Sequence, residues 1–533
     1  MKPIMKLKIF KHLLAVALVA LLPFLSIAQR KANWQNLDLK LDSTFGISTE
    51  KAYKELLKGK KSTPVIVAVI DGGVDLNHED LKRVIWKNTK EIAGNGIDDD
   101  KNGYVDDVYG WNFLGGKDGK SVEFETLELT RLVRRDQTRF AGLTKETVAE
   151  KDQAAYQAFI TNRAELEKKM VTAKSNLQGI SGFKYVLDEL VKKMGVTNPT
   201  VADLEKFTPA GQQEERMKAT LIDILKDMDF KTFYESQIVR GYKHYTEEVQ
   251  YNLNVDYDPR SIVGDDPNNS AERFYGNNDI KGPDALHGSH VAGIIAADRT
   301  NDLGIKGVAD NVLIMGVRNT PSGDERDKDV ANAIRYAADN GAKVLNMSFG
   351  KAYSWDKAVV DEAIKYAVSK DVLLVQAAGN DNADIDVEPN FPSRRYLDGK
   401  VASSYLVVGA SDYKDDESLK ASFSNYGKTA VDVFAPGVRI NSTVPDDNKY
   451  AEEDGTSMAA PVVSGLAALI RSYYPKLTAV QVKDIIMQSV VKVNHNITTL
   501  KGADEVSMPF SDLCVTGGIV NTYNALKLAA TYK

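Results

Sequence analysis

An aspartate, a histidine and a serine of this chain stand in short segments that suit nucleophilic catalysis. Asp71 ends the apolar run PVIVAVI, His287 opens the segment HGSHVAGIIAA, and Ser457 lies in GTSMAAPVVSGLAALI. A serine hydroxyl becomes an effective nucleophile when a base removes its proton, and an imidazole acts as that base when a carboxylate orients it and stabilises its cation. The chain order aspartate, histidine, serine is one of the few known for this set of residues. We therefore predict that Asp71, His287 and Ser457 form a catalytic triad.

These segments, together with two others, resemble the motifs of the subtilisin-like (subtilase, S8-type) serine proteases. The matching stretches are VIDGGVD (69–75), HGSHVAG (287–293), GTSMAAP (455–461), VLNMSFG (344–350) and LVQAAGN (374–380). Taken singly, Asp-Gly-Gly is typical of a turn and Gly-Thr-Ser of a helix start, so the order and number of the segments carry the resemblance. The resemblance implies a serine endopeptidase that acts on protein or peptide substrates through an acyl-enzyme intermediate. The alternative is a catalytically weak binding protein on a protease scaffold.

The resemblance also implies a role for each site residue. Ser457 attacks the scissile carbonyl, His287 transfers the proton, and Asp71 orients His287. Asn380 serves the oxyanion hole beside the backbone N–H of Ser457. The substrate-binding residues are expected to be Ser348, Phe349, Gly350, Ala378 and Gly379.

Two residues near the predicted triad, Gly72 and His290, affect how its members are held. Gly72 stands where the family often has serine or threonine, so a hydroxyl that could bind the Asp71 carboxylate is absent. His290 lies one helical turn after His287, and we interpret it as a packed, hydrogen-bonded neighbour rather than a metal ligand.

The composition favours an exported protein. Residues 1–28 read as a secretory signal peptide, with lysines before an apolar stretch that is too short for a comfortable membrane span. We therefore expect a periplasmic or extracellular protein with no stable membrane span after cleavage. The net charge of −6 over 533 residues argues against nucleic acid as a partner. The single cysteine, Cys514, excludes an intramolecular disulfide and is expected to be buried. Oligomeric state is left open.

Apolar runs alternate with helical periodicity along most of the chain. Strands are predicted at 65–70, 312–317, 343–347, 372–377, 405–409 and 431–434, and helices at 287–297, 327–340, 355–369, 456–473 and 478–490. This alternation predicts an α/β fold with a mostly parallel sheet and helices on both faces.

A long segment separates Asp71 from His287, which lie 216 residues apart, where the family typically has a few tens. Residues 117–254 contain little Gly or Pro and carry apolar stripes of helical spacing, at Phe183, Leu187, Leu190, Val191 and Met194, and at Met217, Leu221, Ile224, Leu225 and Met228. We predict a signal peptide at 1–28, a short segment at 29–63, a catalytic domain at 64–116 and 255–533, and a helical insertion at 117–254. The insertion is interpreted as a structural bundle or as a lid or exosite.

An acidic loop at 95–107 suits calcium. Asp98, Asp100, Asn102 and Asp106 offer oxygen atoms around Gly103, as calcium loops require, but the usual glutamate at the twelfth position is replaced by Tyr109. The resemblance supports a structural calcium here. The alternative is an Asx-rich turn without metal.

Overall fold

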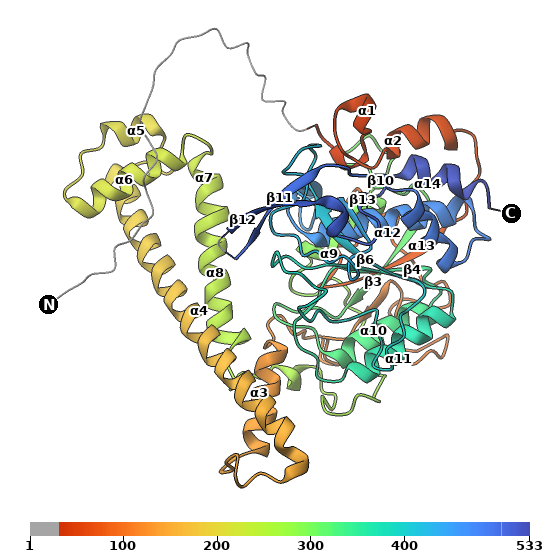
Figure 1. Ribbon diagram of the computed structural model, residues 1–533, viewed down its shortest axis with the longest axis horizontal. Helices are drawn as coiled ribbons and strands as arrows, with labels where there is room; N and C mark the ends of the chain where they lie inside the picture. The colour runs from red at the N-terminus through yellow and green to blue at the C-terminus, as the bar shows by residue number, and fades with distance from the viewer. Residues whose placement is uncertain (1–30, 503, 533) are drawn as a thin grey trace. The chain divides into compact units, whose positions relative to one another are not determined.

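The computed structural model of the chain describes residues 31–502 and 504–532, so the predicted signal peptide at 1–28 lies outside the described residues. A nine-stranded sheet, several of whose strands are labelled in Figure 1, has the order β10-β13-β7-β6-β5-β4-β1-β3-β2. Its strands are β1 (Val65–Asp71), β2 (Gly110–Asn112), β3 (Val312–Arg318), β4 (Val344–Met347), β5 (Leu373–Ala377), β6 (Tyr405–Ser411), β7 (Val433–Pro436), β10 (Val491–Lys492) and β13 (Gly518–Ile519). Every neighbouring pair is parallel except β10 and β13.

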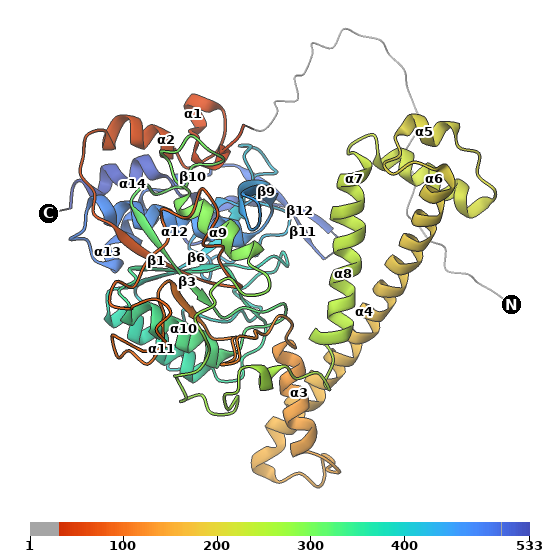
Figure 2. The ribbon, with the colours of Figure 1, turned by 180° about the vertical axis from the view of Figure 1, so that it is seen from behind.

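Helices cover both faces of this sheet (Figure 2). Strand β1 sends Val67 and Val69 to one apolar cluster and Ala68 and Ile70 to the other, because successive side chains of a strand alternate between faces. The first cluster includes residues of α9 (Leu286–Ala296), α12 (Thr456–Tyr473), α13 (Ala479–Gln488) and α14 (Thr522–Ala529), and the second includes residues of α10 (Asp327–Asp339) and α11 (Lys357–Ser369). The predicted α/β class is confirmed.

The six predicted strands and five predicted helices are all present, within about three residues at their ends. Three strands of the sheet, β2, β10 and β13, were not predicted from the sequence. Nor were the two antiparallel hairpins, β8 (Ile440–Val444) with β9 (Lys449–Glu453) and β11 (Asn496–Lys501) with β12 (Asp504–Pro509). Much of β9 and β12 is exposed and polar, so these strands lack the apolar runs that mark the central sheet. Cys514 is buried, as expected.

The segment before β1 packs into the same unit as the sheet. It contains α1 (Leu39–Asp42), α2 (Thr49–Ala52), the 3-10 helix η1 (Trp34–Asn36) and the π-helix η2 (Tyr53–Leu57). Trp34 and Ile47 are buried in the first apolar cluster. The backbone N–H of Thr522 donates to the carbonyl of Ile47 at 2.7 Å, so this segment is tied to the start of α14.

The chain between β2 and α9 is largely helical. Its α-helices are α3 (Glu128–Arg139), α4 (Gln153–Met194), α5 (Val201–Lys206), α6 (Gln212–Ile224), α7 (Phe230–Phe233) and α8 (Arg240–Glu247). Its short 3-10 and π-helices are η3 (Glu150–Asp152), η4 (Tyr234–Val239), η5 (Glu248–Asn252) and η6 (Arg260–Ile262). Outside this segment, the short helix η7 (Phe510–Asp512) follows β12. Helices α4 and α8 run side by side (Figures 1 and 2). The predicted stripes meet in one apolar cluster that holds Leu187, Leu190, Met217 and Leu221, whereas Met228 is partly exposed.

Buried ion pairs attach the first of these helices to the sheet. Lys351, which follows β4 by four residues and is only 1% exposed, places its ammonium 2.5 Å from Glu128 and 2.8 Å from Asp327. Arg131 lies 3.0 Å from Glu128. Burial alone would raise the pKa of Glu128, but the charges of Arg131 and Lys351 lower it to about 2. Glu128 is therefore ionised, and its position at the start of α3 is fixed by cations.

We predict that Lys351→Met destabilises the protein by about 3–5 kcal/mol, because it leaves the buried carboxylate of Asp327 without its cation and removes one of the two cations that pair with Glu128. Lys365→Met is the control, since Lys365 pairs with Glu362 on an exposed face of α11, where loss of a pair costs about 0–1 kcal/mol. Urea denaturation measures both free energies of unfolding. Equal losses in the two variants would contradict the proposed anchoring.

Candidate active site

The side chains of Asp71 and His287 meet at the carboxyl end of the sheet. Asp71 is the last residue of β1, and His287 is the second residue of α9. The two are joined by a hydrogen bond of 2.8 Å between His287 Nδ1 and Asp71 Oδ1. Removal from water would lower the pKa of His287, but the Asp71 carboxylate outweighs this effect and the pKa is raised. The imidazole side chain keeps 42% exposure, so it is open to a reacting group.

The Asp71 carboxylate is held from one side only. Its Oδ1 also accepts the backbone N–H of Gly72 at 2.7 Å. Its Oδ2 is buried and has no hydrogen-bond partner in the part of the chain that the structure describes. A serine or threonine at position 72 could supply a hydroxyl here, so the unusual Gly72 coincides with an unmet acceptor.

Ser457 lies at the second position of α12, where the first amides of the helix are free to donate. Its hydroxyl donates to the carbonyl of Ser348 at 3.1 Å, and the Ser348 hydroxyl donates to the carbonyl of Ser457 at 2.9 Å. No hydrogen bond joins Ser457 to His287 among the described residues. The hydroxyl must therefore turn from Ser348 to His287 Nε2 before its proton moves, an adjustment that sites without substrate often require.

Asn380, three residues beyond β5, is oriented by Thr456. Its Oδ1 accepts both the backbone N–H and the hydroxyl of Thr456 at 2.9 Å each, which leaves the amide hydrogens of Asn380 directed elsewhere. A Cβ atom placed on Gly455 would lie 3.5 Å from Asn380 Nδ2 and 3.5 Å from the backbone nitrogen of Ser457. Both donors thus border one space, which the glycine leaves open. Thr456 was not among the predicted site residues, although it stands inside the serine segment.

Two cavities adjoin these residues, and Ser348 borders both. The larger, about 960 Å³, is lined by Phe349, Gly350 and Gly379 together with Asn380 and Ser457. The smaller, about 340 Å³, is lined by Asp71 and His287. Ala378 is fully buried and does not line either cavity, so it supports the wall from behind.

His290 lies beside the site as a neutral, packed residue. Its Nε2 lies 3.0 Å from the carbonyl of Ala451, and burial lowers its pKa to about 4. These contacts agree with the interpretation of His290 as a structural neighbour.

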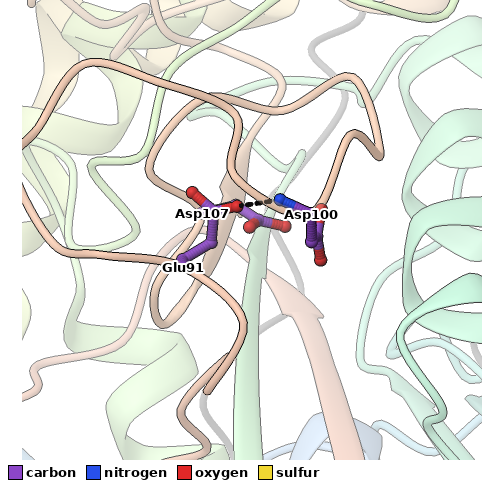
Figure 3. Close-up of side chains that lie close together, drawn as sticks. All are labelled: Glu91, Asp100 and Asp107. Carbon is purple, nitrogen blue, oxygen red and sulfur yellow. Dashed lines mark hydrogen bonds between the residues drawn. The ribbon is translucent and has the colours of Figure 1, made fainter.

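The acidic loop brings together a different set of oxygens from the predicted one. Asp100 lies near Glu91 and Asp107, with carboxylate oxygens within 4.8 Å of one another (Figure 3). Asp98 accepts the backbone N–H of Asn102 and Gly103 at 3.0 and 2.8 Å. Asp106 accepts three backbone N–H groups, from residues 94, 95 and 96, and Asn102 accepts that of Tyr104.

The three clustered carboxylates fit a hard cation. Glu91 and Asp107 are buried, and no lysine or arginine forms an ion pair with any of the three within the described ranges. Burial is the main cause that raises the pKa of Asp107, to about 6, and the neighbouring Asp100 adds to it. The donor set consists only of oxygen, which suits calcium.

Comparisons with known proteins agree on one family. The model of the "Subtilase family" matches residues 62–506. The chain is 39% identical to a thermophilic serine proteinase of Bacillus sp. (strain AK1), over 45% of this chain and 52% of that protein. It is 41% identical to thermitase of Thermoactinomyces vulgaris, over 35% and 61%, and 37% identical to alkaline elastase YaB of Bacillus sp. (strain YaB), over 39% and 51%. The chain thus spans about half the length of the curated relatives it matches.

The unmet oxygen of Asp71 leads to a prediction at position 72. We expect Gly72→Ser to be about 1 kcal/mol more stable than Gly72→Ala, because only the serine hydroxyl can donate to Asp71 Oδ2. The two variants share the same added Cβ, which would lie 3.2 Å from the carbonyl oxygen of Thr320, so any crowding cancels in the comparison. Thermal and urea unfolding measure the difference. Equal stability of the two variants would show that the added hydroxyl does not reach the carboxylate.

Proposed function

The chain belongs to the subtilase family, and we propose on this basis that it is a serine endopeptidase with Asp71, His287 and Ser457 as its triad. The observation that carries the proposal is the 2.8 Å hydrogen bond between Asp71 and His287. Ser348 links this pair to Ser457, because it lines the His287 cavity and its carbonyl accepts the Ser457 hydroxyl. A structural histidine would not need a buried carboxylate that holds one ring nitrogen while 42% of the side chain stays exposed.

The proposed reaction follows from these contacts. Ser457 Oγ attacks the scissile carbonyl carbon while its proton passes to His287 Nε2, and Asp71 stabilises the imidazolium through Nδ1–H. The negative oxygen of the tetrahedral intermediate accepts from the backbone N–H of Ser457 and from Asn380 Nδ2. His287 then gives its proton to the leaving amine. Water hydrolyses the acyl-enzyme by the same steps, with His287 again as base.

The walls of the larger cavity supply the rest of the binding site. Ser348, Phe349, Gly350 and Gly379 contact the substrate in this proposal, and Ala378 shapes the wall without contact. No backbone hydrogen bond within the described ranges engages the N–H and C=O groups of Phe349 and Gly350. An extended peptide could pair with them as an added strand.

We further propose that the protein is exported and that it binds structural calcium. Among the described residues, no helix is long and apolar enough to cross a membrane. Calcium would be held by Glu91, Asp100 and Asp107, and bound there its two positive charges would offset most of the negative charge of the three clustered carboxylates. Asp98, Asn102 and Asp106 would shape the loop through the backbone N–H groups that they accept.

We predict that Ser457→Ala abolishes both peptide hydrolysis and labelling by a fluorophosphonate probe without lowering the melting temperature. Asn380→Ala should lower kcat about 10²–10³-fold and change KM much less, because the oxyanion exists only along the reaction path; that magnitude is the one recorded for the corresponding asparagine of a subtilisin. Steady-state kinetics on a chromogenic peptide measure both. Wild-type hydrolysis by Ser457→Ala would refute the mechanism, and a wild-type protein that the probe does not label would favour the binding-protein alternative.

A second prediction separates the two sets of calcium ligands. A chelator should lower the melting temperature of the wild type, and excess calcium should restore it, because calcium binds the native state; at a concentration 100 times Kd the gain is about 2.7 kcal/mol. Asp107→Asn should abolish the difference between chelator and calcium. Asp98→Asn is the matched control and should keep it, since Asp98 belongs to the same loop but lies outside the cluster of three carboxylates. An unchanged wild-type melting temperature in chelator would exclude a stabilising calcium.

A further inference from the structure

Helix α8 (Arg240–Glu247) forms one wall of the cavity that holds His287. Lys243 and Glu247, one turn apart on this helix, line that cavity together with Asp71 and His287. The helix belongs to the long segment between β2 and α9, far in sequence from both catalytic residues. A substrate that reaches His287 must therefore pass beside α8.

Each end of α8 makes a side-chain contact with a different segment of the chain near this cavity. At its last residue, Glu247 accepts a hydrogen bond of 2.9 Å from the hydroxyl of Ser322, which follows β3 and also lines the cavity. At its first residue, Arg240 lies 3.2 Å from Glu453, the last residue of β9 and four residues before Ser457. An α-helix of this length spans roughly 10 Å between these contacts.

These attachments are weak enough to be broken. The side chain of Arg240 is 61% exposed and that of Glu453 is 20% exposed, and ion pairs in such surroundings contribute little because solvent screens them. Helix α8 packs on α4 and continues without a break into η5, where the side-chain amide of Asn252 donates to the carbonyls of Glu125 at 2.9 Å and Ser322 at 3.2 Å. The end of the helix at Arg240 can thus be displaced from the catalytic side while its packing on α4 and the contacts of Asn252 are kept.

We propose that α8 is a selective wall that admits flexible polypeptide segments and excludes folded proteins from the catalytic centre. This inference rests on the proposed protease function and names its substrate class. A flexible segment enters as one extended strand, which needs a slot about 5 Å wide in the plane of the sheet. In a folded protein, the rest of the domain lies close to the scissile bond. That domain clashes with α8 unless the contact between Arg240 and Glu453 breaks.

Charge reversal tests the wall. The variants are Arg240→Glu, Glu453→Arg and the double variant, and the substrates are a chromogenic tetrapeptide, a stable globular protein, and the same globular protein unfolded by reduction and alkylation. The measured quantity is kcat/KM for each protein divided by kcat/KM for the tetrapeptide at one pH. This ratio cancels any change of intrinsic activity caused by the proximity of Glu453 to the site.

Each single variant should raise the ratio for the folded protein two- to five-fold and leave the ratio for the unfolded protein unchanged. The double variant should return the folded-protein ratio to within two-fold of wild type, because it restores an ion pair of opposite polarity. Arg163→Glu is the control: it breaks an exposed pair with Glu167 on α4, a helix that contributes no residue to the His287 cavity, and should change neither ratio.

An unchanged folded-protein ratio in both single variants would overturn the proposal. A lowered ratio would also overturn it, since that result marks α8 as a docking surface for folded substrates. Failure of the wild type to cleave any of the substrates would refute the protease function itself, and the tetrapeptide distinguishes that failure from failure of the wall.

Discussion

The hydrogen bond between Asp71 and His287 is the constraint on which the rest of the site depends, because it joins residues 216 positions apart at 2.8 Å. Neither residue could hold this position from a loop. Asp71 is fixed as the last residue of a strand paired on both sides, with β3 and β4, and its backbone carbonyl accepts two amides from the chain after β3. His287 stands in the first turn of a helix packed against the same sheet. The parallel sheet therefore brings the carboxyl ends of its strands to one edge, and the groups proposed to be catalytic lie there because the scaffold is rigid there.

The buried carboxylates of this protein are compensated to different degrees at three places, and each case has a different consequence. Around Lys351, carboxylates and cations compensate one another. The ionised groups therefore form a rigid link between α3 and the chain that follows β4. At Asp71, the imidazole of His287 and the backbone N–H of Gly72 both bind one carboxylate oxygen, while the other oxygen has no partner among the described residues, so these two contacts alone align the carboxylate. At Glu91, Asp100 and Asp107, no side-chain cation within the described residues compensates the charge. A buried carboxylate without a cation is costly, and this cost is the physical reason to expect that a metal ion completes the cluster.

The sequence predicted those parts of the structure that are determined by a short stretch of neighbouring residues. The strands of the central sheet are apolar runs, and the catalytic segments are contiguous motifs, so both could be found without knowledge of the fold. The carboxylate cluster could not be found in this way. Glu91 lies outside the acidic loop, and whether Asp98 and Asp106 face a metal or the backbone depends on how the loop closes. Likewise, the orientation of Asn380 depends on a hydrogen bond with Thr456, which is 76 residues away in the sequence. No sequence pattern predicts that contact.

The same limit applies to the helical segment. Its apolar stripes predicted helices that pack on one another, which the cluster around Leu187 and Leu221 shows, but its boundary was set from composition alone. The buried contacts place that boundary differently. Glu128 and Arg131 carry charges that pair with Lys351 and Glu125, so α3 belongs energetically with the wall of the larger cavity even though it precedes the long helices. Removing the predicted insertion at 117–254 would take Glu128 away from Lys351 and leave this buried lysine with Asp327 as its remaining ion-pair partner. The part of this segment that could change without cost to the sheet therefore begins after α3 and ends before Asn252, whose backbone carbonyl accepts the Thr130 hydroxyl at 2.8 Å and whose side-chain amide donates to the carbonyl of Glu125 at 2.9 Å. Between these limits, α8 approaches His287 through exposed contacts that solvent can replace.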